Sequence, residues 1–113
     1  MKKLEVYIQP YSLDAVAQAL AVEGVHGMTV TECKGFGVQR GFTRGEEVQP
    51  GQYRFHPKMK VEMVVADGDV ERIVDAIETS LKSNQIGEGK IFVLPVDDAV
   101  RTRTNARGED AIR

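Results

Sequence analysis

The sequence predicts an α+β fold in which one antiparallel sheet carries two helices on a single face. Two stretches place apolar residues at helical spacing, and four others read as strands. Along the chain they follow the order strand, helix, strand, strand, helix, strand. Two such halves are typical of a sheet that packs both helices against the same face. A length of 113 residues suits one domain, which we place over residues 1–113.

Residues 1–34 supply the first strand, helix and strand. Apolar and polar side chains alternate over residues 3–10, which predicts a strand that buries one face. Ser12 is suited to cap a helix, and apolar residues at intervals of three and four over residues 13–21 give that helix one apolar stripe. Residues 28–34 are rich in β-branched side chains, so we expect a second strand there.

The second half of the chain repeats this order. Residues 59–65 alternate as a strand, and residues 66–69 form a turn with a helix cap built in. Residues 70–81 have the clearest helical spacing in the chain. The apolar run at residues 91–94 predicts a buried strand, which Pro95 stops.

Two segments fall outside this pattern. Residues 37–56 have no periodicity and contain Gly45, Pro50 and Gly51, so we expect a flexible loop. A loop of roughly twenty residues is uncommon in a compact domain and is usually functional or disordered. Residues 97–113 are polar and rich in arginine, so we expect a polar, basic tail.

These elements give the βαββαβ arrangement of ferredoxin-like folds, with an antiparallel sheet and two helices on one face. The opposite face also has apolar positions, and no further element of the chain can cover it. The charged residues Lys60 and Glu62 on that face need water or each other. Self-association is the simplest way to cover such a face, so we expect an oligomer.

Composition and charge exclude several classes of protein. The net charge of −2 and pI of about 5.7 lack the basic footprint of a nucleic-acid-binding protein. No apolar run approaches the ~20 residues that span a bilayer, and polar residues interrupt the first ten positions. We therefore expect neither membrane insertion nor a signal peptide. Cys33 is the only cysteine, which favours a reducing cytoplasm.

The strongest chemical signal is the Gly-Glu-Gly-Lys segment at residues 87–90, followed by Arg101 and Arg103. Glycines let backbone amides approach an anion, lysine supplies a point charge, and arginine forks match phosphate oxygens. In an extended Arg-Thr-Arg segment, both guanidinium groups would lie on one side. A plain turn followed by a solvated basic tail explains the same residues. The P-loop pattern is not met, because Ile91 follows the lysine.

The other candidate sites are weaker. The Gly-Phe-Gly segment at residues 35–37 could bring backbone close to a ligand or act as a hinge for the long loop. His26 and His56 have no ligand spacing to Cys33, so we expect surface histidines and no metal site made of side chains. Adjacent acidic pairs, such as residues 97–98, read as solvated charge. No set of residues suggests covalent or acid–base catalysis, so an enzyme is not expected.

Over essentially its whole length the chain resembles the nitrogen regulatory PII family. The matching motifs, in the same order and spacing, are GMTVTE at 27–32, KGFG at 34–37, IGEGKIFVLP at 86–95, RTRT at 101–104 and RGE at 107–109. The resemblance implies a cytoplasmic homotrimer that binds ATP or ADP, with Mg²⁺ and 2-oxoglutarate, in clefts between neighbouring subunits. It also implies that the long loop (the T-loop, residues 37–56) controls a partner protein, a membrane transporter or a metabolic enzyme.

The resemblance also implies which residues bind these ligands. Thr29 and the backbone near Val64 would hold adenine. At the loop base, Gln39 would help to bind Mg²⁺ and 2-oxoglutarate, and Lys58 would pair with a 2-oxoglutarate carboxylate. The arginines would reach the phosphates from the adjacent subunit. The full nucleotide set is Thr29, Gly35, Gly37, Val38, Val64, Gly87, Glu88, Gly89, Lys90, Arg101 and Arg103.

The loop departs from the family's pattern at several positions. Val38 replaces an arginine that touches phosphate in many members, and Glu47 replaces a loop-tip arginine that plugs ammonium channels. Gly51 occupies the position of the tyrosine that is nucleotidylated in many members. We therefore expect no uridylylation at Tyr53, and partner recognition through the charged tip at residues 44–47.

Other functions of the same fold stay open at this point. A slow nucleotide hydrolase would need a water-activating residue that is not evident, and a trimeric metal-tolerance protein would need a Cys/His set that is not evident either. The effector is also open. Gln39 and Lys58 favour 2-oxoglutarate, whereas the altered loop favours a specialised branch. In that branch, another effector such as bicarbonate would serve inorganic-carbon uptake, carboxysomes or metal transport.

Overall fold

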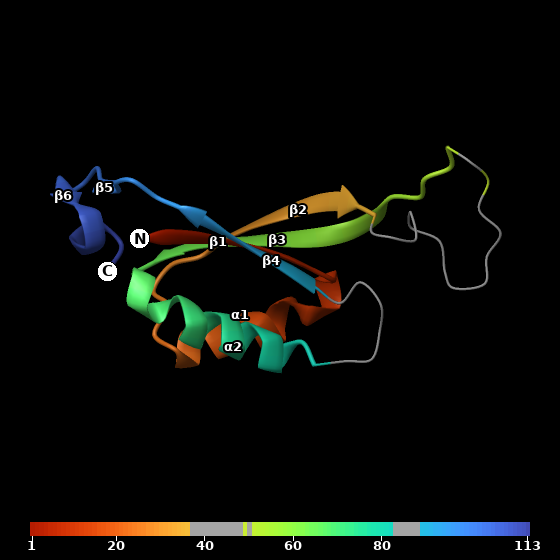
Figure 1. The fold of residues 1–113 in the computed structure, drawn as a ribbon, viewed down its shortest axis with the longest axis horizontal. Coiled ribbons are helices and arrows are strands. Elements are labelled where there is room, and N and C mark those ends of the chain that lie inside the picture. Colours follow the sequence, from red (N-terminus) through yellow and green to blue (C-terminus); the bar gives the residue numbers. More distant parts are fainter. Residues whose placement is uncertain (37–48, 50, 83–88) are drawn as a thin grey trace.

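The computed structural model describes residues 1–36, 49, 51–82 and 89–113 of the chain. Within them, two helices and four long strands follow the predicted order (Figure 1). These elements are β1 (Lys2–Ile8), α1 (Leu13–Val22), β2 (Thr29–Gly35), β3 (His56–Val65), α2 (Val70–Ser80) and β4 (Gly89–Pro95). The four strands form one antiparallel sheet in the order β2-β3-β1-β4. Both helices cover the same face, which confirms the ferredoxin-like prediction.

The core lies between the sheet and the helices. Alternate residues of β1 point into it, and Leu4, Val6 and Ile8 are fully buried. The helices contribute one stripe each, through Val16 and Leu20 in α1 and through Ile73 and Ile77 in α2. The remaining core residues come from β3 and are Val61, Met63 and Val65. The opposite face of the sheet, which we term the open face, carries the intervening residues of each strand.

Each helix begins after a short 3₁₀ helix and not at a side-chain cap, which corrects the two predicted caps. The 3₁₀ helices are η1 (Pro10–Ser12) and η2 (Asp67–Asp69). Ser12 and Asp69 occupy the N-cap positions with φ of −90° and −96°, and neither makes a side-chain cap hydrogen bond. Both residues are already in the helical region, whereas a capping side chain normally starts from an extended backbone.

The tail is folded, which the sequence did not predict. It forms a hairpin of β5 (Val100–Arg101) and β6 (Ala106–Arg107), followed by the 3₁₀ helix η3 (Gly108–Ala111). This hairpin lies beyond the end of β4, beside both chain termini (Figure 1). The prediction of an extended Arg-Thr-Arg segment is wrong, because Arg101 ends β5 and Arg103 lies in the turn. No helix among the described residues is long and apolar enough to cross a membrane.

Candidate functional site

Eight of the predicted ligand-binding residues lie in the described part of the chain. Gly37, Val38, Gln39, Gly87 and Glu88 lie outside it. The eight are placed by the strands and the tail, and they are Thr29, Gly35, Lys58, Val64, Gly89, Lys90, Arg101 and Arg103.

The base of the long loop brings Gly35 and Lys58 together. Gly35 ends β2, and Lys58 lies near the start of β3, opposite Cys33. A Cβ atom at Gly35 would lie 3.8 Å from Cγ of Lys58, so the two residues are neighbours on the open face. The Lys58 carbonyl accepts a hydrogen bond from Cys33 Sγ at 3.6 Å, which ties the two strands together at this point. The lysine side chain is half-buried here.

The start of β4 places Gly89 and Lys90 on opposite faces of the sheet. Gly89 faces the helices, and a Cβ atom there would lie 2.9 Å from Leu81 Cδ1 and 3.4 Å from the Tyr7 carbonyl oxygen. Its absent side chain therefore serves packing, a reason that sequence reasoning missed. Lys90 pairs with Tyr7 across the strands and is exposed on the open face.

The tail presents the two predicted arginines. Arg103 is exposed in the turn between β5 and β6. Arg101 is half-buried, and its guanidinium donates a hydrogen bond to the backbone oxygen of Arg113. The other two tail arginines are ion-paired, because Arg107 lies 2.9 Å from Asp98 and Arg113 lies 3.7 Å from Glu109. The reading of Asp98 as solvated charge is therefore wrong.

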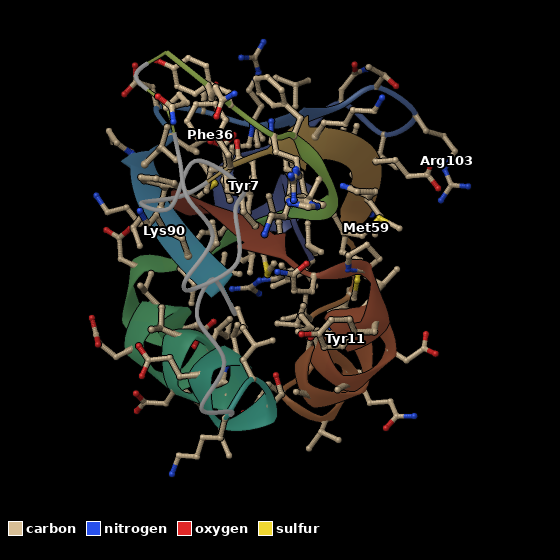
Figure 2. All side chains as sticks on the ribbon, turned by 90° about the vertical axis from the view of Figure 1, so that its right-hand side faces the viewer. Tyr7, Tyr11, Phe36, Met59, Lys90 and Arg103 are labelled. Carbon is tan, nitrogen blue, oxygen red and sulfur yellow. The ribbon has the colours of Figure 1, made fainter. Side chains whose placement is uncertain are left out.

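The structure separates the predicted phosphate ligands. Lys90 lies near the start of β4, whereas the arginines lie beyond its end. From Lys90 to Pro95 the strand advances by about 17 Å at ~3.4 Å per residue. Figure 1 shows the hairpin at the far end of the sheet from the end of β2 and the start of β3, and Figure 2 places Lys90 and Arg103 on opposite sides when the molecule is viewed end on.

The adenine residues are separated from Lys90 as well. Thr29 is exposed at the start of the edge strand β2, and Val64 lies on β3, opposite Lys3. Lys90 lies on the other edge strand, β4, so three strand spacings of ~4.8 Å, about 14 Å in all, separate it from Thr29. One copy of the chain thus carries the predicted ligands as separate groups.

The middle of the open face is charged. Lys60 Nζ lies 3.3 Å from Glu5 and 3.4 Å from Glu62, and Lys3 pairs with both glutamates. Lys60 and Glu62 therefore form an ion pair with each other. Sequence reasoning missed Lys3 and Glu5, which the register of β1 with β3 places beside them. We call these four residues the charge quartet. Phe92 and Leu94 lie beside it on β4 and are exposed. The buried strand predicted at residues 91–94 is therefore wrong for a single copy, because residues 92–94 are exposed and only Ile91 is half-buried.

These contacts shift the pKa values of three members of the charge quartet, which are Lys3, Lys60 and Glu62. The hydrogen bond from Lys3 holds the pKa of Glu62 below its ordinary value of 4.5, and the same bond raises the pKa of Lys3 above 10.5. The hydrogen bond to Glu5 likewise raises the pKa of Lys60. Glu62, Lys3 and Lys60 are therefore charged at neutral pH.

Three aromatic rings gather at the base of the long loop. The Phe36 ring centroid lies 4.8 Å from that of Tyr53 and 5.0 Å from that of Phe55. All three side chains stay exposed, by 39 to 58%. They bring the residue after β2 into contact with the segment before β3 (Figure 2 labels Phe36). Sequence reasoning noted the apolar character of residues 53 and 55 without pairing them with Phe36.

Comparison with known proteins gives a consistent family. The family model for nitrogen regulatory protein P-II matches residues 1–106. Proteins named nitrogen regulatory protein P-II from Cereibacter sphaeroides and Azospirillum brasilense are 47% and 49% identical over 112 and 115 residues. One from Synechocystis is 43% identical over 112 residues. Each alignment covers 99% of this chain and 100% of the relative. This chain therefore belongs to the nitrogen regulatory protein P-II family.

Proposed function

We propose that the chain is a signal-transduction regulator that binds ATP or ADP in clefts between the subunits of a homotrimer. Membership of the P-II family supports the regulatory role. The observation that carries the binding proposal is the separation of Lys90 from Arg101 and Arg103 along the full length of β4. These are the cations suited to phosphate, and one copy holds them too far apart to meet on one phosphate chain.

A closed ring of copies resolves this separation. In a head-to-tail arrangement, the hairpin of one subunit can meet the start of β4 in the next, and a rotation that closes the ring makes every such contact equivalent. Each cleft would then combine Lys90 from one copy with both arginines from its neighbour. Lysine would act as a point charge, and the arginine forks would bind phosphate oxygens in pairs.

The base of the long loop is the proposed effector site. Lys58 beside Gly35 offers a cation where the loop joins the sheet, which suits a carboxylate of 2-oxoglutarate. When bound, Mg²⁺ would neutralise charge on the phosphates, with Gln39 as the proposed protein ligand. A ligand at this place would bias the directions in which the loop leaves the sheet. The loop would in turn bind its partner, a transporter or a metabolic enzyme, in only one of these states.

A mixing experiment tests the shared cleft. Lys90→Ala and Arg103→Ala chains should each bind ATP at least tenfold more weakly than wild type, since one charge-assisted hydrogen bond is worth about 1.5–3 kcal/mol. Unfolding and refolding the two variants together should regenerate one wild-type cleft in every mixed trimer, and calorimetry should detect the returning high-affinity sites. Refolding each variant alone is the control. If mixing restores no tight binding, then the cleft does not lie between copies.

A ligand screen by calorimetry identifies the effector. ATP and ADP should bind the wild-type chain, and 2-oxoglutarate should bind more tightly when ATP and Mg²⁺ are present. Lys58→Ala should abolish the 2-oxoglutarate signal and leave ADP binding intact. AMP and bicarbonate complete the screen, and a bicarbonate response in place of 2-oxoglutarate would replace the effector proposed here.

A further inference from the structure

Asp98 holds both ends of the tail hairpin with one carboxylate. Its Oδ1 accepts hydrogen bonds from the backbone N–H of Ala99 at 2.8 Å and of Gly108 at 3.2 Å. Its Oδ2 accepts one from Arg107 Nη1 at 2.9 Å. Ala99 leads into β5 and Gly108 follows β6, so the carboxylate spans the entrance and the exit of the hairpin. The direct bond from Gly108 N–H to the Ala99 carbonyl, at 3.0 Å, closes the same point.

The hairpin has little else to fix its shape. Its strands are two residues long, and Val100 is exposed, so no apolar core supports them. The turn is closed by the Arg101 carbonyl, which accepts from Thr104 N–H at 3.3 Å and from Asn105 N–H at 2.8 Å. Asn105 has a φ of 60°, a conformation that asparagine tolerates better than most residues. Such a small ribbon depends on polar contacts at its base.

The contacts also divide the tail arginines by role. Arg107 forms an ion pair with Asp98, so its charge is neutralised at the base of the hairpin. Arg101 is the last residue before the turn and Arg103 lies in the turn, so neither belongs to that ion pair. Asp98 bonds to backbone and to Arg107, while Arg101 donates to the main-chain oxygen of Arg113 and Arg103 lies exposed in the turn. The pKa of Asp98 is held below its ordinary 3.8, chiefly by Arg107, so the carboxylate is charged at neutral pH.

We propose that Asp98, with Arg107 as its partner, is a positioning residue that sets the placement of Arg101 and Arg103 for nucleotide phosphate. This inference rests on the proposed function. Its physical basis is preorganisation: a hairpin already fixed in its binding shape loses less conformational entropy when the phosphate binds. Asp98 and Arg107 are themselves exposed, by 48% and 69% of their side chains, and exposed ion pairs add little to overall stability. Their loss should therefore lower affinity more than it lowers the unfolding midpoint.

Affinity measurements on the full chain test this assignment. Asp98→Ala removes three acceptor contacts and should raise the Kd for ATP about tenfold. Asp98→Asn keeps an oxygen for the two backbone amides, so its Kd should rise by only about threefold. Arg107→Ala should resemble Asp98→Asn. Asp14→Ala is the matched control, because it removes an exposed aspartate from the first turn of α1, at the other end of the molecule, and should leave the Kd unchanged.

A second background separates positioning from general destabilisation. In Arg103→Ala chains, Asp98→Ala should raise the Kd by a smaller factor than in wild type, since one of the two arginines that it positions is gone. Equal factors in both backgrounds, or a wild-type Kd for Asp98→Ala, would overturn the inference. If Lys90→Ala weakens ATP binding while Asp98→Ala does not, only this inference fails. If the wild-type chain binds no ATP, the proposed function fails and this inference fails with it.

Discussion

Gly89 joins two roles in one position. The resemblance to the P-II family places it among the nucleotide ligands, and the structure places it in close contact with Leu81 and the Tyr7 carbonyl. A side chain here would have to displace the Leu81 side chain, just after α2, and would press against the Tyr7 carbonyl. Tight packing, and not a positive φ, therefore restricts which residue the start of β4 can carry at this position.

Gly89→Ala should destabilise the fold by about 1–3 kcal/mol, the usual cost of overpacking a tight site. The added methyl would lie 2.9 Å from Leu81 Cδ1, which can move, but also 3.4 Å from a backbone oxygen, which moves less readily. Chemical denaturation would measure the loss. Gly27→Ala is the control, because no atom lies within 4 Å of the Cβ that it would add. Equal stability of the two variants would contradict the packing role.

Tyr53 should resist uridylylation. The position that carries the modified tyrosine in many family members is Gly51, whose φ of 81° marks a left-handed turn. The Tyr53 ring instead stacks against Phe36 at 4.8 Å. Incubation with a uridylyltransferase active on ordinary family members should leave the intact mass unchanged, while such a member gains the adduct in the same reaction. A stoichiometric nucleotidyl adduct on Tyr53 would show that this account of the loop is wrong.

At the scale of elements, the sheet separates two surfaces of different character. Its helix face carries the apolar core, and the middle of its open face carries the charge quartet of Lys3, Glu5, Lys60 and Glu62. The quartet depends on the register of β1 with β3, which sets Glu5 opposite Glu62 and Lys3 opposite Val64. Without the interleaved lysines, two glutamates facing each other would destabilise this pairing.

The pKa shifts of Lys3, Lys60 and Glu62 define the pH range in which these three groups contribute to stability. Glu62 has a lowered pKa, so its contribution to stability is present above 4.5 and is lost as pH falls through that lowered value. Lys3 and Lys60 have raised pKa values, so their contribution is present below 10.5 and is lost as pH rises through the raised values. The unfolding midpoint should therefore be flat between 4.5 and 10.5, as far as these groups determine it.

Thermal unfolding over a pH series checks this expectation. Glu62→Gln should give a shallower loss of stability on the acid side than wild type, because the group that titrates there is gone. Glu71→Gln changes an exposed glutamate on α2 and should leave the acid limb as in wild type. An acid limb that is the same in Glu62→Gln and in wild type would assign the pH dependence to other groups.

At the scale of the whole molecule, the separated ligands and the uncovered open face both favour association of several copies. Light scattering at micromolar concentration should give about three times the chain mass of 12.5 kDa. Lys60→Glu should shift the protein toward monomer, since it puts three carboxylates together on a face that would otherwise be buried. Lys34→Glu, on the helix-side face of β2, is the matched control and should remain a trimer. A stable wild-type monomer would exclude the shared cleft.

Most of the fold could be predicted from the sequence, because periodicity alone distinguishes strands from helices. The alternation in β1 and the three-four spacing in α2 both matched the structure. The tail hairpin could not be predicted in this way. It depends on an Asp98–Arg107 pair nine residues apart and on the positive φ of Asn105, and neither leaves a hydrophobic pattern. Both helices begin where the spacing predicted, at residues 13 and 70, but without the predicted side-chain caps, because a 3₁₀ helix precedes each of them.

The candidate site was predictable as a set of residues but not as an arrangement. The motifs predict that Lys90 and Arg101 share one phosphate site, and the resemblance implies that the arginine comes from the adjacent subunit. The structure adds that one copy holds the two residues at opposite ends of β4. Only half of the charge quartet could be predicted. The spacing within β3 indicates Lys60 and Glu62, but their partners on β1 lie more than fifty residues away in the sequence. Contacts between strands depend on register, which a single strand does not encode.

The charge quartet has one more consequence, which concerns ionic strength. It holds two ammonium and two carboxylate groups, so its own net charge is zero and it adds no long-range repulsion between copies. The ligands at Lys90, Arg101 and Arg103 are all cationic, and their attraction for phosphate weakens as the Debye length falls from about 10 Å at 0.1 M salt to about 3 Å at 1 M. Sodium chloride should therefore release nucleotide from the protein well before it separates the copies.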